Sequence, residues 1–421
     1  MSMKICFFTE NYYKGGLDTF LINLINAWPD AKDELILVCN GTHLGLDTIE
    51  NKIKRPLTIR KYYRAFTSGI VLGLSTYWWS KSFAVRAFFR LAFRLLQYPI
   101  LFPWYVFTLT LLFWFSDYES LMVVNGGYPG SLLCRCAVIA WNLAGKRRLA
   151  VMNFHNSATT PPWYDRIFEY IIDVLVIRSA SHIVSVSENC LSSLKSRSAF
   201  SDSSKLSYVY NGIVDPRRLY KPNFTTDQSK SFVDRYCLML ATYEPRKGHA
   251  YLLQAFQIIV MDFPDVQLQI YGHGRLNERK LVADEVVRLK LENNVILGDF
   301  TPHTAELLEG ASVLVVPSQA YESFGLSIIE AMAFGVPVVT TDVGGMPEVL
   351  ADSNAGYVCS KDDSLEFATA IKNILGNSKL ASELGRNGRL AFESRFMATK
   401  MAQEYASIIK KKNYADFLYG Y

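Results

Sequence analysis

Short apolar runs alternate with longer segments of helical periodicity along most of this chain of 421 residues. Continuous apolar runs of this kind are typical of strands that are buried on both faces of a parallel sheet. Strands that alternate with helices in this way indicate βαβ units. The pattern therefore predicts an α/β protein, and the length predicts two domains.

The expected elements fall into two sets. The first set of strands is Lys4–Phe8, Leu35–Cys39, Leu121–Val124, Leu149–Phe154 and His182–Val186, with helices at Leu17–Trp28, Gly130–Leu143 and Trp163–Ser179. The second set of strands is Cys237–Ala241, Gln267–Tyr271, Val295–Leu297, Val313–Pro317 and Val336–Thr340, with helices between them.

A polar stretch without clear periodicity, Tyr220–Phe232, is interpreted as the linker between two Rossmann-like domains. We therefore expect a first domain over residues 1–220 and a second over 233–395. A helical tail over 396–421 should pack back toward the first domain. Two such domains would face each other across a ligand cleft at their strand C-termini.

One part of the first domain is unusually basic and apolar, and we interpret residues 51–116 as an apolar helical insert. It contains ten basic residues and no acidic residue. The net charge of the whole chain is +5, so the rest of the chain has a net charge of −5. Its last third, Leu95–Ser116, contains no charge at all. As a helix this part would extend about 33 Å, which is long enough to cross a bilayer.

The topology nevertheless argues against a membrane span, because a bilayer would separate strands of one sheet. Pro99 and Pro103 would also interrupt a straight helix. Two alternatives remain: an insert buried against the first domain, or an element that enters the membrane and returns on the same side. We favour the second, since Arg86, Arg90 and Arg94 form one basic stripe beside many aromatic residues.

Basic residues combined with apolar ones indicate an anionic membrane surface as a partner, and no nucleic-acid-binding module is recognisable. The seven cysteines are scattered and lie mostly in apolar runs, as is typical of reduced thiols in a cytoplasmic protein. The N-terminus enters a strand at once, so no signal peptide is expected. These features predict a cytoplasmic protein, peripheral to the inner face of the cell membrane.

The strongest chemical signal lies in the second domain, in "PSQAYESFGLSIIEAMAFGVPVV". A turn at Ser323–Gly325 follows a strand, and a helix should run from Leu326 to Phe334. The start of that helix offers free backbone N–H groups and the positive end of a dipole, which suit an anion. Two carboxylates, Glu322 and Glu330, bracket the helix start.

Upstream, "ATYEPRKGHAYLLQAF" places Arg246 and Lys247 at another turn between a strand and a helix. Two cations and a helix N-terminus that face one cleft would stabilise a diphosphate, including one that gains charge as it leaves. Either feature alone would more often be an ordinary surface turn. Their joint occurrence in this order favours the functional interpretation.

Here the chain resembles the retaining glycosyltransferases of family 4, which have the GT-B fold. Glu322 and Glu330 have the E-x7-E spacing of that family, and the helix sequence is close to its consensus. By this resemblance, Glu322 contacts hydroxyls of the donor sugar and Glu330 binds the nucleotide ribose. The N–H groups of Phe324, Gly325 and Leu326 would hold the distal phosphate, and Lys247 matches the diphosphate lysine.

The sequence departs from the family at one position. A Gly-Arg-Leu motif, whose arginine contacts the diphosphate, usually precedes the lysine, whereas this chain has Ala241, Thr242 and Tyr243. We expect Arg246 to substitute. The Gly-x-Gly pair at Gly272 and Gly274 resembles a family turn, which we interpret as a tight turn and not as a ligand contact.

In the first domain, Gly15 and Gly16 lie between the first strand and a helix, where glycine lets backbone approach a phosphate closely. An ordinary flexible loop is the alternative. The resemblance implies that this pair contacts the donor diphosphate. It also implies that His155, just after a strand, lies near the donor sugar and acceptor. We therefore expect Glu322, Lys247 and His155 to be catalytic.

The resemblance implies a retaining hexosyltransferase that moves a sugar from a nucleotide-sugar to a glycan acceptor. The expected acceptor is lipid-linked, in cell-surface polysaccharide biosynthesis. A UDP-sugar is the first expectation for the donor and GDP-mannose the second. No metal or other cofactor is expected, because cations and the helix dipole would neutralise the diphosphate. The alternatives are a sugar-nucleotide epimerase or phosphorylase of the same fold, or a non-enzymatic membrane adaptor.

Overall fold

The computed structural model describes residues 2–62, 97–146, 149–220 and 236–410. The chain divides into two compact units. Residues 1–210 and 399–421 form the first unit, and residues 211–398 form the second. Residues 211–220, expected in the first domain, thus belong to the second unit. The predicted linker lies almost wholly outside the described residues.

The first unit contains a seven-stranded sheet in the order β3-β2-β1-β4-β5-β6-β7, and every neighbouring pair is parallel. Its strands are β1 (Lys4–Thr9), β2 (Glu34–Asn40), β3 (Thr58–Tyr62), β4 (Ser120–Asn125), β5 (Ala150–Phe154), β6 (His182–Ser185) and β7 (Leu206–Tyr208). The inner strands are buried almost throughout, as continuous apolar sequences require.

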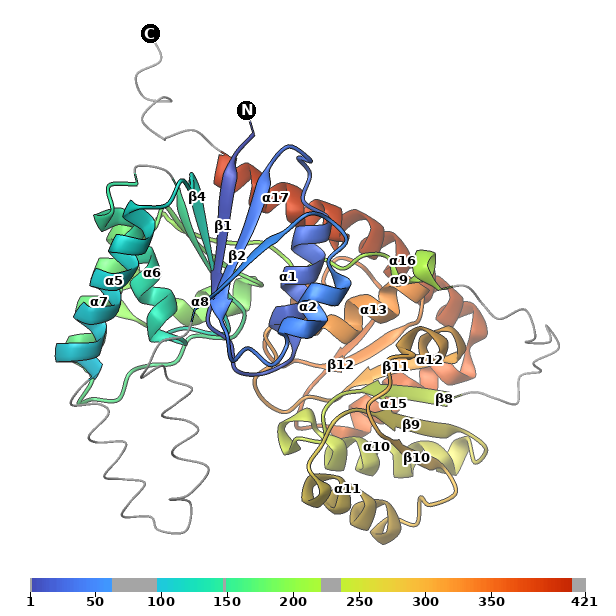
Figure 1. Cartoon of the computed structure of the whole chain (residues 1–421). Coiled ribbons are helices and arrows are strands. Elements are labelled where there is room, and N and C mark those ends of the chain that lie inside the picture. The colour runs from blue at the N-terminus through green and yellow to red at the C-terminus, as the bar shows by residue number, and fades with distance from the viewer. Residues whose placement is uncertain (1, 63–96, 147–148, 221–235, 411–421) are drawn as a thin grey trace. The chain divides into compact units, whose positions relative to one another are not determined.

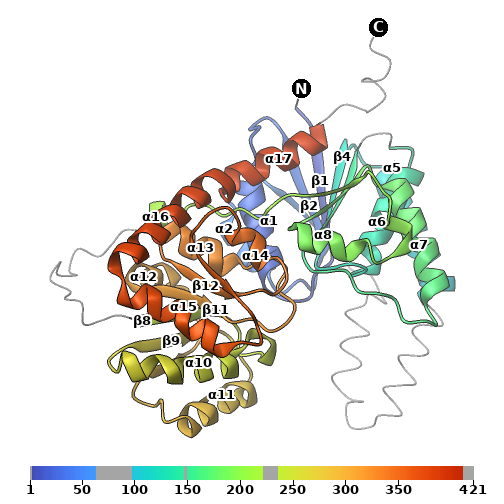
Figure 2. The ribbon, with the colours of Figure 1, turned by 180° about the vertical axis from the view of Figure 1, so that it is seen from behind.

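Helices cover both faces of this sheet (Figures 1 and 2). One face carries α1 (Gly16–Asn26), α2 (Leu46–Lys52) and the last helix, α17 (Ala398–Lys410). The other face carries a wide helical turn, η1 (Gln97–Leu101), and the helices α5 (Phe102–Trp114), α6 (Leu132–Leu143) and α7 (Arg166–Ser179). The helix α8 (Glu188–Leu194) and a short turn, η2 (Ser198–Phe200), precede β7.

The expected apolar insert is only partly within the described residues. Its first part was misassigned, because Thr58–Tyr62 forms β3, the edge strand of the sheet. Residues 63–96, with the arginine stripe at Arg86, Arg90 and Arg94, lie outside the described residues. The prediction that strands on either side of the insert share one sheet is confirmed, since β1 pairs directly with β4.

The chain from Gln97 to Trp114 is helical, and Pro99 lies in the wide turn η1 that precedes α5. Among the residues that the structure describes, no helix is both long and apolar enough to cross a membrane. Helix α5 itself has 13 residues, or about 20 Å of length.

The second unit contains a six-stranded parallel sheet in the order β10-β9-β8-β11-β12-β13. Its strands are β8 (Tyr236–Leu240), β9 (Gln267–Tyr271), β10 (Val295–Gly298), β11 (Val313–Val316), β12 (Val338–Thr341) and β13 (Gly356–Cys359). Its helices are α9 (Pro216–Leu219), α10 (His249–Asp262), α11 (Leu276–Arg288), α12 (Thr304–Gly310), α13 (Leu326–Phe334), α14 (Met346–Leu350), α15 (Ser364–Gly376) and α16 (Ser378–Arg395), with a short 3₁₀ turn, η3 (Pro245–Lys247).

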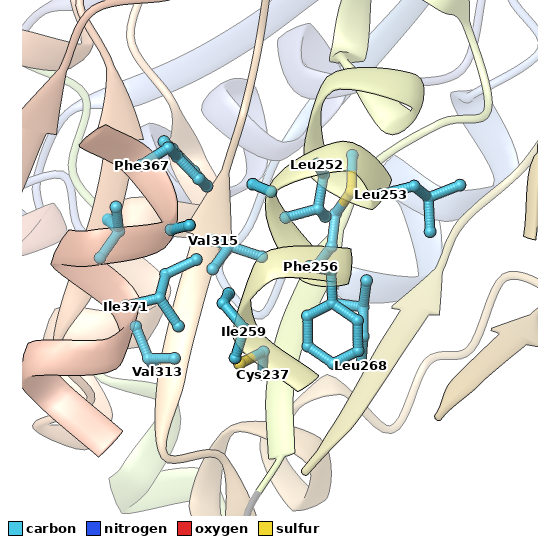
Figure 3. Close-up of a cluster of buried hydrophobic side chains, with 14 of the residues drawn as sticks. Cys237, Leu252, Leu253, Phe256, Ile259, Leu268, Val313, Val315, Phe367 and Ile371 are labelled. Atoms are coloured by element: carbon cyan, nitrogen blue, oxygen red, sulfur yellow. The ribbon is translucent and has the colours of Figure 1, made fainter. Parts of the chain in front are cut away.

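The core of the second unit lies between this sheet and the helices α10 and α15 (Figure 3). Phe256 and Ile259 of α10 point at the strands, and Phe367 and Ile371 of α15 approach from the neighbouring position. These side chains are completely buried. Such packing fixes α10 on the sheet and thereby the turn η3 that precedes it.

Candidate active site

In the second unit, a turn between β11 and α13 carries the expected carboxylates. Helix α13 begins at Leu326, as the sequence predicts, and Gly325 precedes it with φ of 89°. Glycine adopts this left-handed conformation without the steric cost of a Cβ. The buried Phe324 packs against Phe396 with ring centroids 5.9 Å apart. The N–H groups at the start of α13 and the positive end of its dipole therefore point out of a well-packed turn.

Glu322 and Lys247, which are distant in sequence, meet at this turn. The Lys247 ammonium donates to a Glu322 carboxylate oxygen at 2.5 Å. Their side chains are 16% and 15% exposed, so the pair is shielded from water without being closed off. Ser318 lies beside the same carboxylate oxygen, with its hydroxyl 3.4 Å away. An ammonium and a carboxylate are thus held at the mouth of one helix N-terminus.

Two glycines allow the loops that carry Lys247 and Glu322 to approach each other closely. Gly248, after η3, has φ of 80°, and a Cβ on it would lie 1.8 Å from the carbonyl oxygen of Pro317. Gly344 has φ of 63°, and a Cβ there would lie 1.8 Å from the Glu322 carbonyl oxygen. The N–H of Gly345 donates to that same carbonyl at 2.9 Å. Loops after β8, β11 and β12 are therefore locked together by backbone contact.

Arg246 lies beside this turn but is turned toward other partners. Its guanidinium donates to Glu244 at 2.5 Å and to the Tyr321 carbonyl at 3.2 Å. The side chain is 34% exposed, about twice as much as that of Lys247. The structure therefore brings Lys247 into direct contact with Glu322. Arg246 instead contacts Glu244 and the backbone of Tyr321, the residue before Glu322.

The residues that replace the family's Gly-Arg-Leu motif have structural partners. Tyr243 is buried, stacks on His249 at 5.2 Å and donates its hydroxyl to the Gly298 carbonyl at 2.8 Å. The Thr242 hydroxyl donates to Glu244 at 3.2 Å. Cβ atoms on Gly272 and Gly274 would strike Ala241 and Tyr243, so the close approach of the loops after β8 and β9 requires both glycines.

Glu330 has a different environment from Glu322. It lies on α13, and among the described residues no group pairs with its carboxylate. Burial without a compensating cation raises the pKa of Glu330 to about 7. A carboxylate in this condition is available to accept hydrogen bonds from a ligand, and such bonds would favour its ionised form.

In the first unit, Gly15 precedes α1 in an extended conformation, and a Cβ on it would meet no atom within 4 Å. Its N–H donates to Asp18 at 3.0 Å. Asp18 is buried and also contacts the His43 ring nitrogen Nε2 at 2.7 Å. Asp18 and His43 were missed in the sequence, although the spacing from Gly15 to Asp18 is that of a capping box.

His155 follows β5, and its N–H donates to the Asn125 carbonyl at 3.1 Å. The ring packs edge-on against Phe20 with centroids 4.3 Å apart. Its Nε2 is buried and has no hydrogen-bond partner among the described residues. Burial lowers the pKa of His155 to about 3, so the imidazole is neutral at physiological pH.

The expected site residues thus form two groups, each within one unit. Gly15, Gly16 and His155 belong to the first unit, and the residues from Arg246 to Glu330 belong to the second. Among the residues described, no cluster of three or more His, Cys, Asp or Glu side chains could hold a metal ion.

Comparison with known proteins gives a consistent result. Residues 225–391 match the family model described as "Glycosyl transferases group 1". N-acetyl-alpha-D-glucosaminyl L-malate synthase of Bacillus anthracis is 26% identical over 276 residues, which cover 65% of this chain and 70% of that protein. Phosphatidyl-myo-inositol mannosyltransferase of Mycolicibacterium smegmatis is 38% identical over 148 residues, or 35% and 37% of the two chains.

Similarity to solved structures extends over nearly the whole chain. The crystal structure of HepE from Anabaena in complex with UDP-glucose aligns with a TM-score of 0.69 and 19% identity. The alignment covers 97% of this chain and all of that one. At this identity the likeness establishes the fold, with two α/β units that each contain a parallel sheet.

Proposed function

We propose that this chain is a group 1 glycosyltransferase that transfers a sugar from a nucleotide-sugar with retention of anomeric configuration. The observation that carries the proposal is the pair of Lys247 and Glu322 beside the N-terminus of α13, with the unpaired Glu330 about one turn into that helix. An ammonium, free N–H groups and an unpaired carboxylate are the groups that a nucleoside diphosphate linked to a sugar needs.

The roles of these groups follow from their chemistry. The N–H groups of Phe324, Gly325 and Leu326 would hold the distal phosphate, where the helix dipole favours negative charge. The Lys247 ammonium would neutralise the charge that develops as the diphosphate leaves, and Arg246 would add to that field from the adjacent turn. Glu330 would accept hydrogen bonds from the ribose hydroxyls.

Donor binding would rearrange the pair. Glu322 is held by Lys247 in the free protein, and an incoming diphosphate would compete for that ammonium. The released Glu322 carboxylate could then accept hydrogen bonds from hydroxyls of the donor sugar. The ion pair would thus compensate the charges of Lys247 and Glu322 until the donor binds and takes the place of each partner.

The first unit would supply the acceptor side of the reaction. Gly15 and Gly16 would let backbone approach the diphosphate, since no atom of the protein occupies the space where a Gly15 Cβ would lie. His155 would act as a neutral imidazole near the donor sugar and acceptor. Its unpaired Nε2 is suited to a hydrogen bond and, with a pKa of about 3, poorly suited to hold a proton.

For the donor we propose a UDP-sugar first and GDP-mannose second. The Anabaena protein with the same fold binds UDP-glucose, which supports the first, and the similarity to a mannosyltransferase supports the second. For the acceptor we propose a lipid-linked glycan at the inner face of the membrane, in assembly of a cell-surface polysaccharide. The apolar surface of α5 supports this placement.

The test is product analysis with a panel of labelled UDP- and GDP-sugars, with membrane extract or detergent-solubilised lipid acceptors and with EDTA present. We expect nucleoside diphosphate to be released only as sugar appears on the acceptor, with the α-configuration of the donor retained. Free sugar epimers or sugar phosphates would instead identify an epimerase or a phosphorylase. Loss of activity in EDTA would contradict the metal-independent mechanism.

A further inference from the structure

A groove of about 620 Å³ lies between the edge strand β3 and helix α5 in the first unit. Leu111, Leu112 and Phe115 of α5 line one side of it. The side chain of Arg60 in β3 lines the other, and among the described residues no carboxylate takes part in the lining. Lys61, the next residue of the strand, directs its ammonium to the opposite face of the sheet, where it pairs with Glu50 of α2 at 3.2 Å. The groove therefore has one apolar wall and one wall with a single cation.

The Arg60 guanidinium is positioned over the groove and is available to a ligand. It lies 5.5 Å from the centre of the Tyr118 ring, which holds it by a cation–π contact. No carboxylate among the described residues forms an ion pair with it. Asp117, whose charge lies near that of Arg60, is already paired with Lys4 at 2.5 Å.

Helix α5 is apolar on its outer as well as its inner face. Tyr105, Leu109 and Phe113 are buried beneath it. The outer face exposes five large side chains, each between 43% and 83% accessible: Trp104, Phe107, Leu111, Trp114 and Phe115. A helix that is apolar all round needs an apolar environment on every side, and water alone does not supply it.

The apolar surface continues from α5 onto α7. Tyr98 of η1 stacks on Phe168 of α7 with ring centroids 4.9 Å apart. Around this contact, α7 and the turn before it also expose Trp163, Ile167 and Ile171, each at least half accessible. Both helices pack on α6, on the same side of the sheet (Figures 1 and 2). Exposed Trp and Tyr beside Arg are typical of surfaces at the membrane–water interface.

We infer that the β3–α5 groove binds the headgroup of an anionic phospholipid while the outer faces of α5 and α7 enter the membrane interface. The Arg60 guanidinium matches a phosphate, and the apolar wall matches the first methylenes of the acyl chains. A second copy of this chain would bring two Arg60 side chains together, so charge favours the lipid. This inference rests on the proposed membrane association and names its site.

The experiment is flotation of the full-length protein with vesicles of phosphatidylcholine, with or without 30% phosphatidylglycerol. We expect the parent protein to bind the anionic vesicles at least about tenfold more strongly. Arg60→Glu reverses one charge and should lower that binding about tenfold or more, because each cation near such a surface contributes about 1 kcal/mol. Arg386→Glu, an exposed arginine of the second unit, makes the same charge change and should have little effect.

A second measurement tests the apolar contact. Phosphatidylglycerol brominated near the headgroup should quench the fluorescence of the parent protein. Replacing both Trp104 and Trp114 with Phe should remove most of that quenching, whereas Trp28→Phe, at a buried tryptophan on the opposite face of the sheet, serves as the control. Transfer to a water-soluble acceptor without vesicles should be unchanged in Arg60→Glu, which shows that the variant folds and retains its chemistry.

The outcomes separate this inference from the proposed function. Anionic vesicle binding that survives Arg60→Glu would overturn the groove site and leave membrane association standing. No vesicle binding by the parent protein would overturn both the groove site and the proposed membrane association. Competition by inorganic phosphate, preferential binding of lipid-linked acceptor over phosphatidylglycerol, or dimerisation through α5 without lipid would each assign the surface to another occupant and overturn the inference.

Discussion

At the scale of single residues, the pair of Lys247 and Glu322 should decide the rate of transfer. Lys247→Ala removes the cation that we place on the leaving diphosphate, so kcat at saturating donor should fall about 10²–10³-fold. Lys247→Arg should retain part of the activity, because the charge remains while the geometry changes. The exposed Lys361→Ala is the matched control. A loss of folding stability without a loss of kcat would show that the pair is only structural.

Glu330 should make stability depend on pH. Its pKa is about 7 in the folded protein and about 4.5 when unfolded, so ionising it opposes folding as pH rises across that interval. Glu330→Gln should therefore leave the free energy of unfolding unchanged near pH 4.5. At pH 8 it should increase that free energy by about 1–2 kcal/mol, allowing for partial contact with water.

Denaturant unfolding at several pH values, without donor, measures this effect. Glu383→Gln, at an exposed carboxylate of α16, provides the baseline. The same Glu330→Gln variant should bind donor more weakly, because a neutral amide accepts fewer hydrogen bonds from a ribose than a carboxylate does. A variant that is less stable than the parent at pH 8 would contradict an uncompensated carboxylate at this position.

At the scale of elements, two glycines at strand-to-helix turns should respond differently to alanine. Gly248→Ala forces a Cβ against the Pro317 carbonyl at a φ of 80°, so stability should fall by more than about 2 kcal/mol. Gly15→Ala meets no atom, so stability should stay within about 0.5 kcal/mol while the KM for donor rises. Thermal unfolding and donor titration check both. An unchanged donor KM in Gly15→Ala would remove that loop from the diphosphate site.

Most elements were predictable because a strand buried on both faces leaves a continuous apolar run. Strand β9 and helix α13 begin and end where the sequence indicated, since glycine, proline or polar residues flank them. The strands β3, β7 and β13 were not predicted from the sequence, and all three are edge strands. Edge strands contact water on one side and pair with one neighbour, so polar residues such as Arg60 and Lys61 are tolerated in them.

The sequence was enough to propose the residues of the candidate site, but not the contacts between them. A fixed spacing such as that of Glu322 and Glu330 survives in the sequence because both lie on one turn and helix. The contact of Lys247 with Glu322 depends on close backbone approaches at Gly248 and Gly344, which no local pattern reveals. The role of Asp18 was missed for the same reason, because His43 reaches it from a separate loop.

At the scale of the whole molecule, the chain returns to its first unit at its end. Helix α17 follows directly after the last helix of the second unit but packs on the first sheet. Met401, Tyr405 and Ile409 are buried in that core. The Asn153 amide donates to the Tyr405 hydroxyl at 2.6 Å, and Lys410 pairs with Asp30 at 2.7 Å. The first unit is therefore completed by the last described helix of the chain.

Removing residues 399–421 should consequently destabilise the first unit and leave the stability of the second unit unchanged. Three large buried side chains at about 1.5–3 kcal/mol each represent most of the stability of an ordinary domain. We expect thermal unfolding of the truncated chain to separate into an early transition for the first unit and a later one for the second. Removing only residues 411–421 is the control, and its thermal unfolding profile should be the same as that of the parent protein. The truncated protein should still bind UDP by calorimetry, because Lys247, Glu330 and the start of α13 all lie in residues 211–398. Loss of UDP binding together with an intact second transition would show that the nucleotide needs the first unit as well.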